Sequence, residues 1–376
     1  MRDYYKWAKE FSDKYIKPVA EEIDENGKFP KEIFDKIKEE GFFKVLVPAE
    51  YGGEGAGPEA QAFITQAFAE GAATVGLGYT MHNVALKFVL TFADEDFKKF
   101  IIKEVVENNK MLSLARSEFE SGVHVFKSQT QLEEFEDYAV INGVKSMITS
   151  ANYADYYLIS VPKNSKGEMK NWLIPRESEG LTFKESDWRG IGMKGNNSCP
   201  MIMEKIKLDN KYGIKICRKT CPQPYEVNID VIYFMTGLAG VYSGVCQSLF
   251  ESALYHAENR KYGESSLADI EPIQVHLSKL YANVLAAKGA LESAVNSFSK
   301  LEEDGFRKIM TARIIASENS IENANIAMRI GGGQAYNRKG NIERLMRDAY
   351  ASQVMFPSID VLKSWVGKNI TGNTIL

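Results

Sequence analysis

Few side chains in this 376-residue chain have the types and spacing that metal binding or catalysis requires. The closest pair is Cys217 and Cys221, which has no second pair and no histidine nearby. Reduced structural thiols are therefore the favoured interpretation, and we expect no metal site. The four histidines show no HExxH spacing, and no GxSxG, Walker or Rossmann glycine motif occurs.

The stretch from Ile330 to Ser358 is the best candidate for ligand binding. Its glycine triplet, Gly331 to Gly333, allows positive φ angles and lets another group approach the main chain closely. Apolar residues at helical spacing precede the triplet and resume at Ile342. The pattern predicts a helix, a glycine turn and a second helix, with a plain helix stop as the alternative.

Composition narrows the class of protein. The chain has 46 basic and 50 acidic residues, a formal charge of −4 and no long run of one sign, which disfavours nucleic-acid partners. No run of about eighteen apolar residues is present and the first residues do not resemble a signal peptide, so we expect no membrane insertion. The expected location is cytoplasmic, or the mitochondrial matrix for a mature eukaryotic chain.

The elements that must position these residues fall into three parts. Helical periodicity covers the first hundred or so residues, and a glycine-rich loop precedes a helix that begins near Pro58. From Met111 the period drops towards two, with Asn142 and Gly143 predicting a hairpin turn. Helical periodicity returns at Val227. The sequence predicts an α+β chain with domains at 1–110, 111–215 and 216–376.

Two motifs resemble those of one enzyme family. The segments GGQAY and IERLMRDA resemble the "GGxGY … ERLxRDA" signature of the acyl-CoA dehydrogenase superfamily, and VPAEYGGEG resembles its "xPxEYGGxG". The resemblance covers essentially the whole chain. It implies a helical N-terminal domain, a middle β-barrel and a C-terminal four-helix bundle that bind FAD.

The same resemblance assigns residues to the flavin ring. SEFESGVH is similar to "TEPxAGSD", which places Ser117 where the family hydrogen-bonds the flavin. KSMITSA is similar to "KxWITN", with Met147 in the place of the ring that packs on the isoalloxazine and Thr149 retained near N5. A thioether can also pack on an aromatic face. By themselves these residues would suit any strand.

Other residues match the family's nucleotide contacts. HAENRKYG resembles "YAxxRxxFG" with one residue fewer, so Arg260 is the candidate that grips the FAD pyrophosphate across a subunit interface; Asn259 is the other match. Arg329 replaces the Gln of "QxxGG", where a cation near phosphates is favourable. The remaining implied nucleotide-side residues are Gln274, Gly332, Gly333 and Ser358.

The catalytic base is missing from both usual places. Counting from Arg347 and Asp348, the family's glutamate falls at Phe356, and the alternative address on an earlier helix falls at Phe234. Phenylalanine cannot accept a proton. Asp230 and Asp360 lie one helical turn from these places, a shift of roughly 5 Å, and are weak candidates for a displaced base.

Three functions remain open. The first is an FAD-dependent oxidoreductase of fatty acid metabolism that dehydrogenates an acyl-CoA or related thioester with a displaced base, passing electrons to electron transfer flavoprotein. The second is a flavoenzyme of the same fold without α-proton abstraction, desulfinase-like or a monooxygenase. The third is a non-catalytic flavoprotein. The resemblance also implies a homotetramer or homodimer.

Overall fold

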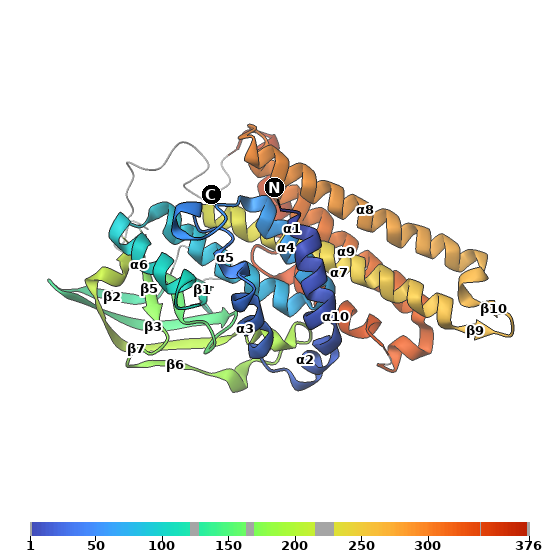
Figure 1. Ribbon diagram of the computed structural model, residues 1–376, viewed down its shortest axis with the longest axis horizontal. Helices are drawn as coiled ribbons and strands as arrows, with labels where there is room; N and C mark the ends of the chain where they lie inside the picture. The colour runs from blue at the N-terminus through green and yellow to red at the C-terminus, as the bar shows by residue number, and fades with distance from the viewer. Residues whose placement is uncertain (1, 121–127, 163–168, 215–228, 339, 374–376) are drawn as a thin grey trace.

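The computed structural model describes residues 2–120, 128–162, 169–214, 229–338 and 340–373. Helices, sheets and again helices follow each other along the chain (Figure 1). The helices are α1 (Tyr4–Phe11), α2 (Ala20–Asn26), α3 (Lys31–Glu39), α4 (Pro58–Gly71), α5 (Ala73–Phe92), α6 (Glu95–Val106), α7 (Ile229–Asn259), α8 (Glu271–Ser299), α9 (Gly305–Tyr336), α10 (Ile342–Val354) and α11 (Ile359–Ile370). The strands are β1 (Leu112–Ala115), β2 (Gln131–Glu134), β3 (Tyr138–Ile148), β4 (Tyr156–Pro162), β5 (Met169–Pro175), β6 (Leu181–Phe183), β7 (Cys199–Asp209), β8 (Gly213–Ile214), β9 (Lys261–Tyr262) and β10 (Ser265–Ser266).

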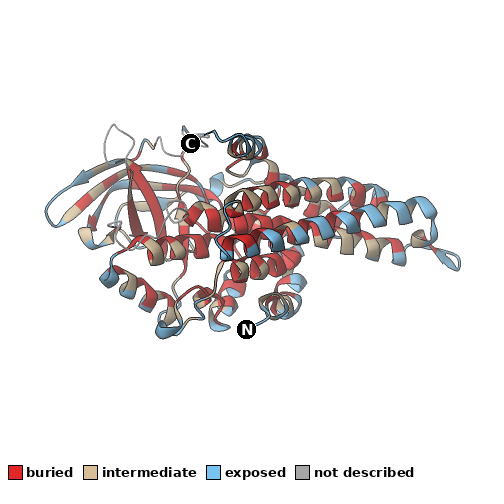
Figure 2. Ribbon diagram, turned by 90° about the horizontal axis from the view of Figure 1, so that it is seen from above, coloured by how far each residue is buried: buried red, intermediate tan, exposed pale blue. Residues whose placement is uncertain are grey.

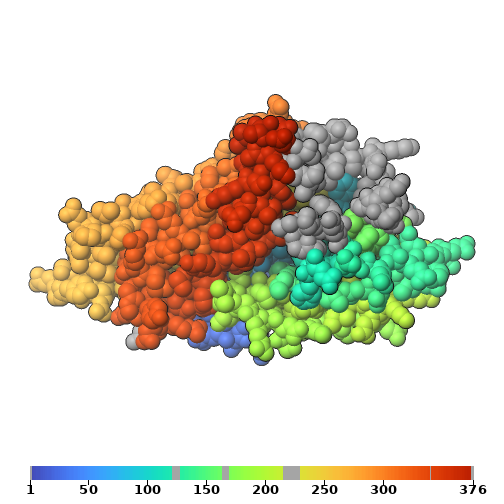
Figure 3. Space-filling view, turned by 180° about the vertical axis from the view of Figure 1, so that it is seen from behind, coloured from blue at the N-terminus to red at the C-terminus, as the bar shows by residue number. Residues whose placement is uncertain are grey.

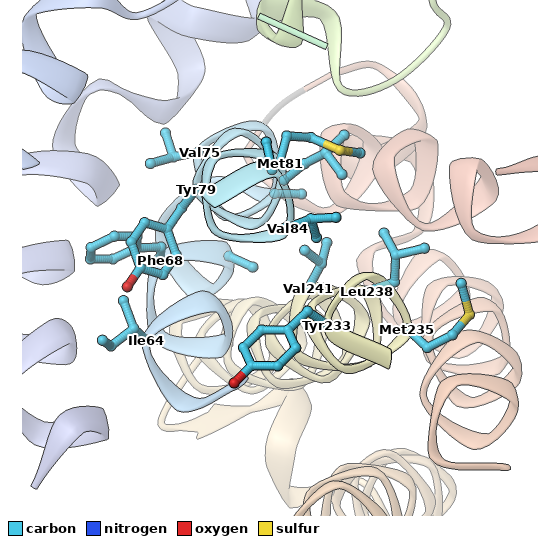
Figure 4. Close-up of a cluster of buried hydrophobic side chains, with 14 of the residues drawn as sticks. Ile64, Phe68, Val75, Tyr79, Met81, Val84, Tyr233, Met235, Leu238 and Val241 are labelled. Carbon is cyan, nitrogen blue, oxygen red and sulfur yellow. The ribbon is translucent and has the colours of Figure 1, made fainter. Parts of the chain in front are cut away.

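The core of the molecule forms where α4 and α5 meet α7. Their buried side chains, among them Phe68, Tyr79 and Leu238, interlock in Figure 4. Small residues on α7 allow this close approach, because a Cβ on Gly240 would lie 2.7 Å from the carbonyl oxygen of Ala62. The helix predicted to begin near Pro58 is α4, which has this proline at its start.

The middle part consists of two four-stranded sheets, in the orders β1-β4-β5-β8 and β2-β3-β7-β6. The predicted hairpin at Asn142 and Gly143 is wrong. Both residues lie inside the continuous strand β3, and Gly143 (φ +151°) marks a shift of the β3–β7 register. Between Ile141 and Gly143 the partner strand β7 has the extra residue, where Lys205 has φ +50°, so the Asn-Gly pair lies opposite a bulge and does not form a turn.

Three long helices and the shorter α10 form the C-terminal bundle. Helix α9 breaks at the predicted glycine triplet, because Gly332 has non-helical angles of φ +54° and ψ −143°. A short helical segment follows this kink to Tyr336, and the next helix, α10, begins at Ile342. Figure 2 shows that the bundle is buried near the sheets and increasingly exposed towards β9 and β10.

The expected domain boundaries fall at different kinds of position. The boundary at 110/111 lies between the end of α6 at Val106 and the start of β1 at Leu112. The boundary at 215/216 lies outside the described residues, as do Cys217 and Cys221. Within the described residues, one helix, α7, is long and apolar enough to cross a membrane, and 89% of its apolar window is buried inside the protein, as in a core helix.

Candidate functional site

The three residues predicted to face the flavin ring lie together in the middle part; we call Ser117, Met147 and Thr149 the flavin-side group. The backbone N–H of Ser146, which precedes Met147, donates to the carbonyl oxygen of Ser117 at 2.7 Å. The hydroxyl of Thr149 lies 3.0 Å from that of Ser198. The end of β3 therefore holds the segment that follows β1.

Met147 has an unusual backbone for its residue type. Its φ is +50°, the β3–β7 register shifts between Lys145 and Ile148, and 58% of the Met147 surface is exposed. A non-glycine residue with positive φ is uncommon, and such conformations cluster at ligand-binding sites. Strand β3 thus exposes the thioether of Met147 at the position where the resemblance places the isoalloxazine ring.

A buried ion pair supports this group from inside the sheets. Lys145 is completely buried and donates to the carboxylate of Glu118 at 2.5 Å and to the carbonyl oxygen of Ser160 at 2.8 Å. Burial acts to raise the pKa of Glu118, but hydrogen bonds from Lys145 and Ser128 hold it below its usual range. Sequence reasoning missed this pair, although Glu118 and Lys145 lie within the two motifs that identified Ser117 and Met147.

The two usual base positions are apolar in three dimensions as well. Phe234 is half-buried on α7, and Phe356 is half-buried before α11, with its ring edge-on to Trp365 at a centroid distance of 6.1 Å. Neither side chain can accept a proton. The geometry thus provides no carboxylate at these two addresses.

The displaced carboxylates differ in their surroundings. Asp230, in the first turn of α7, is buried and paired with the guanidinium of Arg116, which directly precedes Ser117. Asp360 is exposed in the first turn of α11, which is red on the molecular surface in Figure 3. Asp230 is therefore next to the flavin-side group, whereas Asp360 faces solvent in a single chain.

Ser358, the predicted nucleotide contact, precedes α11 and is half-buried, with no capping hydrogen bond from its side chain.

The other predicted nucleotide contacts, which we call the nucleotide-side group, are Arg260, Gln274, Arg329, Gly332 and Gly333. All five are exposed. At Gly332 and Gly333 no atom lies within 4 Å of the position that a Cβ would occupy, so a ligand can approach the main chain there. Gln274 instead donates to the carbonyl oxygen of Ala268 at 3.0 Å.

A cavity of about 710 Å³ opens beside this group. Arg260 lines it together with Gln334 and Arg344, whereas Gly332 and Gly333 do not. Arg344 is buried, its Nη1 lies 3.6 Å from Asp348, and its Nε has no hydrogen-bond partner within the described residues. An unsatisfied buried guanidinium is suited to a phosphate. The motif IERLMRDA contains this arginine, so the motif was the signal that could have identified it.

The two groups lie at opposite ends of α7. Arg116 joins the flavin-side group to Asp230 at the start of this helix, and Arg260 follows its last residue. A helix of 31 residues is about 46 Å long. Figure 1 shows the sheets at one end of the molecule and the β9–β10 hairpin at the other. One dinucleotide cannot reach both groups within a single chain.

The residues present fit FAD. Gly332 and Gly333 expose backbone, and the cavity is lined by guanidinium groups that suit phosphates. At the other group, the hydroxyls of Ser117 and Thr149 lie beside the exposed thioether of Met147, which suits a flavin ring. Within the described residues, no group of three or more His, Cys, Asp or Glu side chains is placed to hold a metal. Together with the order of helices, sheets and helices, this site defines a flavin-dependent oxidoreductase.

Comparison with known proteins identifies the family. Family models of the acyl-CoA dehydrogenase N-terminal, middle and C-terminal domains match residues 2–109, 113–206 and 236–371. The chain therefore belongs to the acyl-CoA dehydrogenase family and is an FAD-dependent oxidoreductase of that type.

Relatives and solved structures agree with this placement. A 3-(aryl)acrylate reductase of Clostridium sporogenes is 27% identical, with 97% of each chain covered. The caffeyl-CoA reductase-Etf complex subunit CarC of Acetobacterium woodii is 26% identical over 91% of this chain and 90% of its own. The butyryl-CoA dehydrogenase of Megasphaera elsdenii shares the fold, with a TM-score of 0.89, 19% identity and coverage of 98% and 97%.

Proposed function

We propose that this protein interconverts the saturated and α,β-unsaturated forms of an acyl compound, without a carboxylate at either usual base address. FAD, when bound, supplies the hydride acceptor or donor. The observation that carries the proposal is the flavin-side group beside the start of α7, where Asp230 is a buried carboxylate on the helix that also holds Phe234. Other family members act on coenzyme A thioesters, so an acyl thioester is the first substrate to test.

Different residues of the chain orient the flavin, bind the nucleotide and handle the proton. Ser117 and Thr149 orient the flavin ring by hydrogen bonds, and Met147 packs on its face. Arg260, Gln274, Arg329, Gly332 and Gly333 hold the nucleotide, with Ser358 as a further contact. Asp230, one helical turn before Phe234, is positioned by Arg116 to hold or take up a proton.

We also infer that the FAD site is shared between two copies of the chain. The flavin-side and nucleotide-side groups lie about 46 Å apart along α7, so one FAD needs the first group from one copy and the second from another. A homodimer or homotetramer follows. Electron transfer flavoprotein is the proposed redox partner, supported by a relative whose name includes an Etf complex.

We propose that the protein can also reduce the α,β-unsaturated compound, because two relatives are named reductases. The test is anaerobic spectroscopy of the purified FAD-loaded protein. Saturated acyl-CoAs of several lengths should bleach the oxidised flavin band, and α,β-unsaturated compounds should restore it after chemical reduction. A protein that retains no FAD, or one that instead consumes supplied reduced flavin with oxygen, contradicts the proposal.

A further inference from the structure

The guanidinium of Arg116 lies at the junction of sheets and helices, between β1 and the start of α7. Its Nη1 donates to Asp230, and its planar group lies over the ring of Phe88 on α5, 5.3 Å from the ring centroid. The Asp230 side chain is 7% exposed, whereas 21% of the Arg116 side chain remains open to solvent. The guanidinium thus packs on an aromatic ring, pairs with one carboxylate and keeps part of its surface open to solvent.

The donors of Arg116 are only partly used. A guanidinium carries five N–H groups in a fixed fork, and Asp230 accepts from Nη1. The Nε of Arg116 is buried without a hydrogen-bond partner among residues 2–120, 128–162, 169–214, 229–338 and 340–373. Nε and Nη2 together form the edge that a carboxylate binds through two parallel hydrogen bonds. A buried donor without an acceptor is a position that a bound acceptor group can complete.

The neighbouring carboxylates within the described part of the chain do not fill this edge. Glu118, two residues along the chain, is bound by Lys145 at 2.5 Å and by the hydroxyl of Thr130 at 2.7 Å. Asp230 occupies the opposite side of the guanidinium. The acceptor that completes Arg116 is therefore expected to come from a bound molecule.

The position of this edge relates it to the reaction. Arg116 directly precedes Ser117 of the flavin-side group, and Asp230 lies four residues before Phe234 on the same face of α7. The chain thus has a partly accessible cation directly beside the flavin-side group.

We propose that Arg116 binds the carboxylate of a free carboxylic acid substrate through Nε and Nη2, so that the substrate class is small acids with an apolar or aromatic body. Asp230 accepts from Nη1 of the same guanidinium and competes with the substrate carboxylate for its positive charge. This inference rests on the proposed α,β-oxidoreductase function and specifies the acyl compound as a free acid in place of the thioester. Arg116 is then the residue that selects an anionic head group.

The test compares an acid with its neutral amide on the FAD-loaded protein. Calorimetric titration with 3-phenylpropanoate and 3-phenylpropanamide measures binding without turnover. The amide should bind at least about tenfold more weakly, because it loses a charge-assisted fork. Arg116→Gln should weaken acid binding by about 30-fold or more and leave amide binding unchanged, while Arg116→Lys restores part of the loss. The exposed Arg189→Gln is the matched control and should change neither affinity.

A second variant covers the case in which Arg116→Gln does not fold or retain FAD. Asp230→Asn removes the competing negative charge and should tighten acid binding without tightening amide binding. Equal affinities for acid and amide, or unchanged acid affinity in Arg116→Gln, overturn the inference. Unchanged or weaker acid binding in Asp230→Asn also overturns it. Flavin bleaching by thioesters with no acid binding overturns this inference alone, whereas failure to retain FAD in the parent protein overturns the proposed function.

Discussion

Arg347 on α10 grips Asp24 on α2 with both ends of its guanidinium, at 2.8 and 2.5 Å, across 323 residues of sequence. The same side chain donates to the carbonyl oxygen of Ile191 at 2.9 Å and to Glu343 at 2.8 Å. One arginine thereby joins the first helical part, the middle part and the bundle. Burial acts to raise the pKa of Asp24, but Arg347 holds it below its usual range.

Replacing Arg347 should loosen this junction. Arg347→Ala leaves the buried Asp24 with Lys194 and Arg338, each 3.8 Å away, so we expect a loss of about 3 kcal/mol in the free energy of unfolding. Urea unfolding at neutral pH measures it. The control is Arg176→Ala, which removes an exposed pair with Glu177 and should cost less than about 0.5 kcal/mol. Equal effects of the two variants would contradict this role.

Lys145 should be needed for the stability of the sheets. Lys145→Met leaves Glu118 buried without its cation, and breaking a buried pair from one side typically costs about 3–5 kcal/mol. The double variant Lys145→Met, Glu118→Leu should recover most of that loss, because no uncompensated charge remains. Thermal unfolding of the single and double variants gives the comparison. Lys170→Met, at an exposed pair with Glu134, is the control and should be nearly neutral.

His82 should make stability fall in acid. Its Nε2–H donates to the carbonyl oxygen of Phe43 at 3.0 Å and its Nδ1 accepts the N–H of Leu112 at 3.1 Å, which leaves no room for a second proton. Burial lowers the pKa of His82 to about 4. Because the unfolded chain titrates near 6.5, it binds more protons between these values, and the free energy of unfolding decreases as pH falls from about 6.5 to 4, by about 3 kcal/mol in total.

The measurement for His82 is a series of urea unfolding curves at pH 7.5, 6, 5 and 4.5. His82→Gln should be less stable at pH 7.5 but show a shallower decline between pH 6.5 and 4.5. Ser278→Ala, an exposed change on α8 that removes no titrating group, should keep the parent slope. The same decline in His82→Gln as in the parent would assign the acid effect to other groups.

The shared FAD site predicts complementation between copies. Met147→Glu disturbs the flavin side and Arg260→Glu the nucleotide side, so each variant alone should lose most of its FAD. Coexpression should restore about a quarter of the sites, because half of randomly formed pairs are mixed and each mixed pair has one intact site. The FAD content of the purified mixture checks this. No recovery on mixing would place both groups on one FAD within a chain.

A carboxylate placed at Phe356 should increase α-proton abstraction. Phe356→Glu puts a base at the family's usual address, and a positioned general base contributes about 10²- to 10⁴-fold to rate. The rate of flavin bleaching by an acyl-CoA measures the gain, and Phe356→Gln, equal in size but neutral, is the control. If both variants bleach at the same rate, the position does not face the substrate.

The sequence alone was sufficient for the order of helices, sheets and helices, because periodicity and turn residues are local properties. It also located Ser117, Met147 and Thr149 by motif, and the structure places all three close together. Asn142-Gly143 shows the limit of local patterns, whereas the glycine triplet breaks its helix as predicted. A glycine with positive φ can lie within a strand as well as in a turn, and only the pairing with the neighbouring strand selects between them.

Only the tertiary structure decided which charges are buried and what they face. Arg116 with Asp230, Lys145 with Glu118, and Asp24 with Arg347 are separated by 114, 27 and 323 residues, so no spacing rule connects them. The structure likewise separated the predicted FAD contacts into two groups at opposite ends of α7. A motif records the residue types at a contact, whereas the long-range packing of helices on sheets determines which contacts can belong to the same ligand.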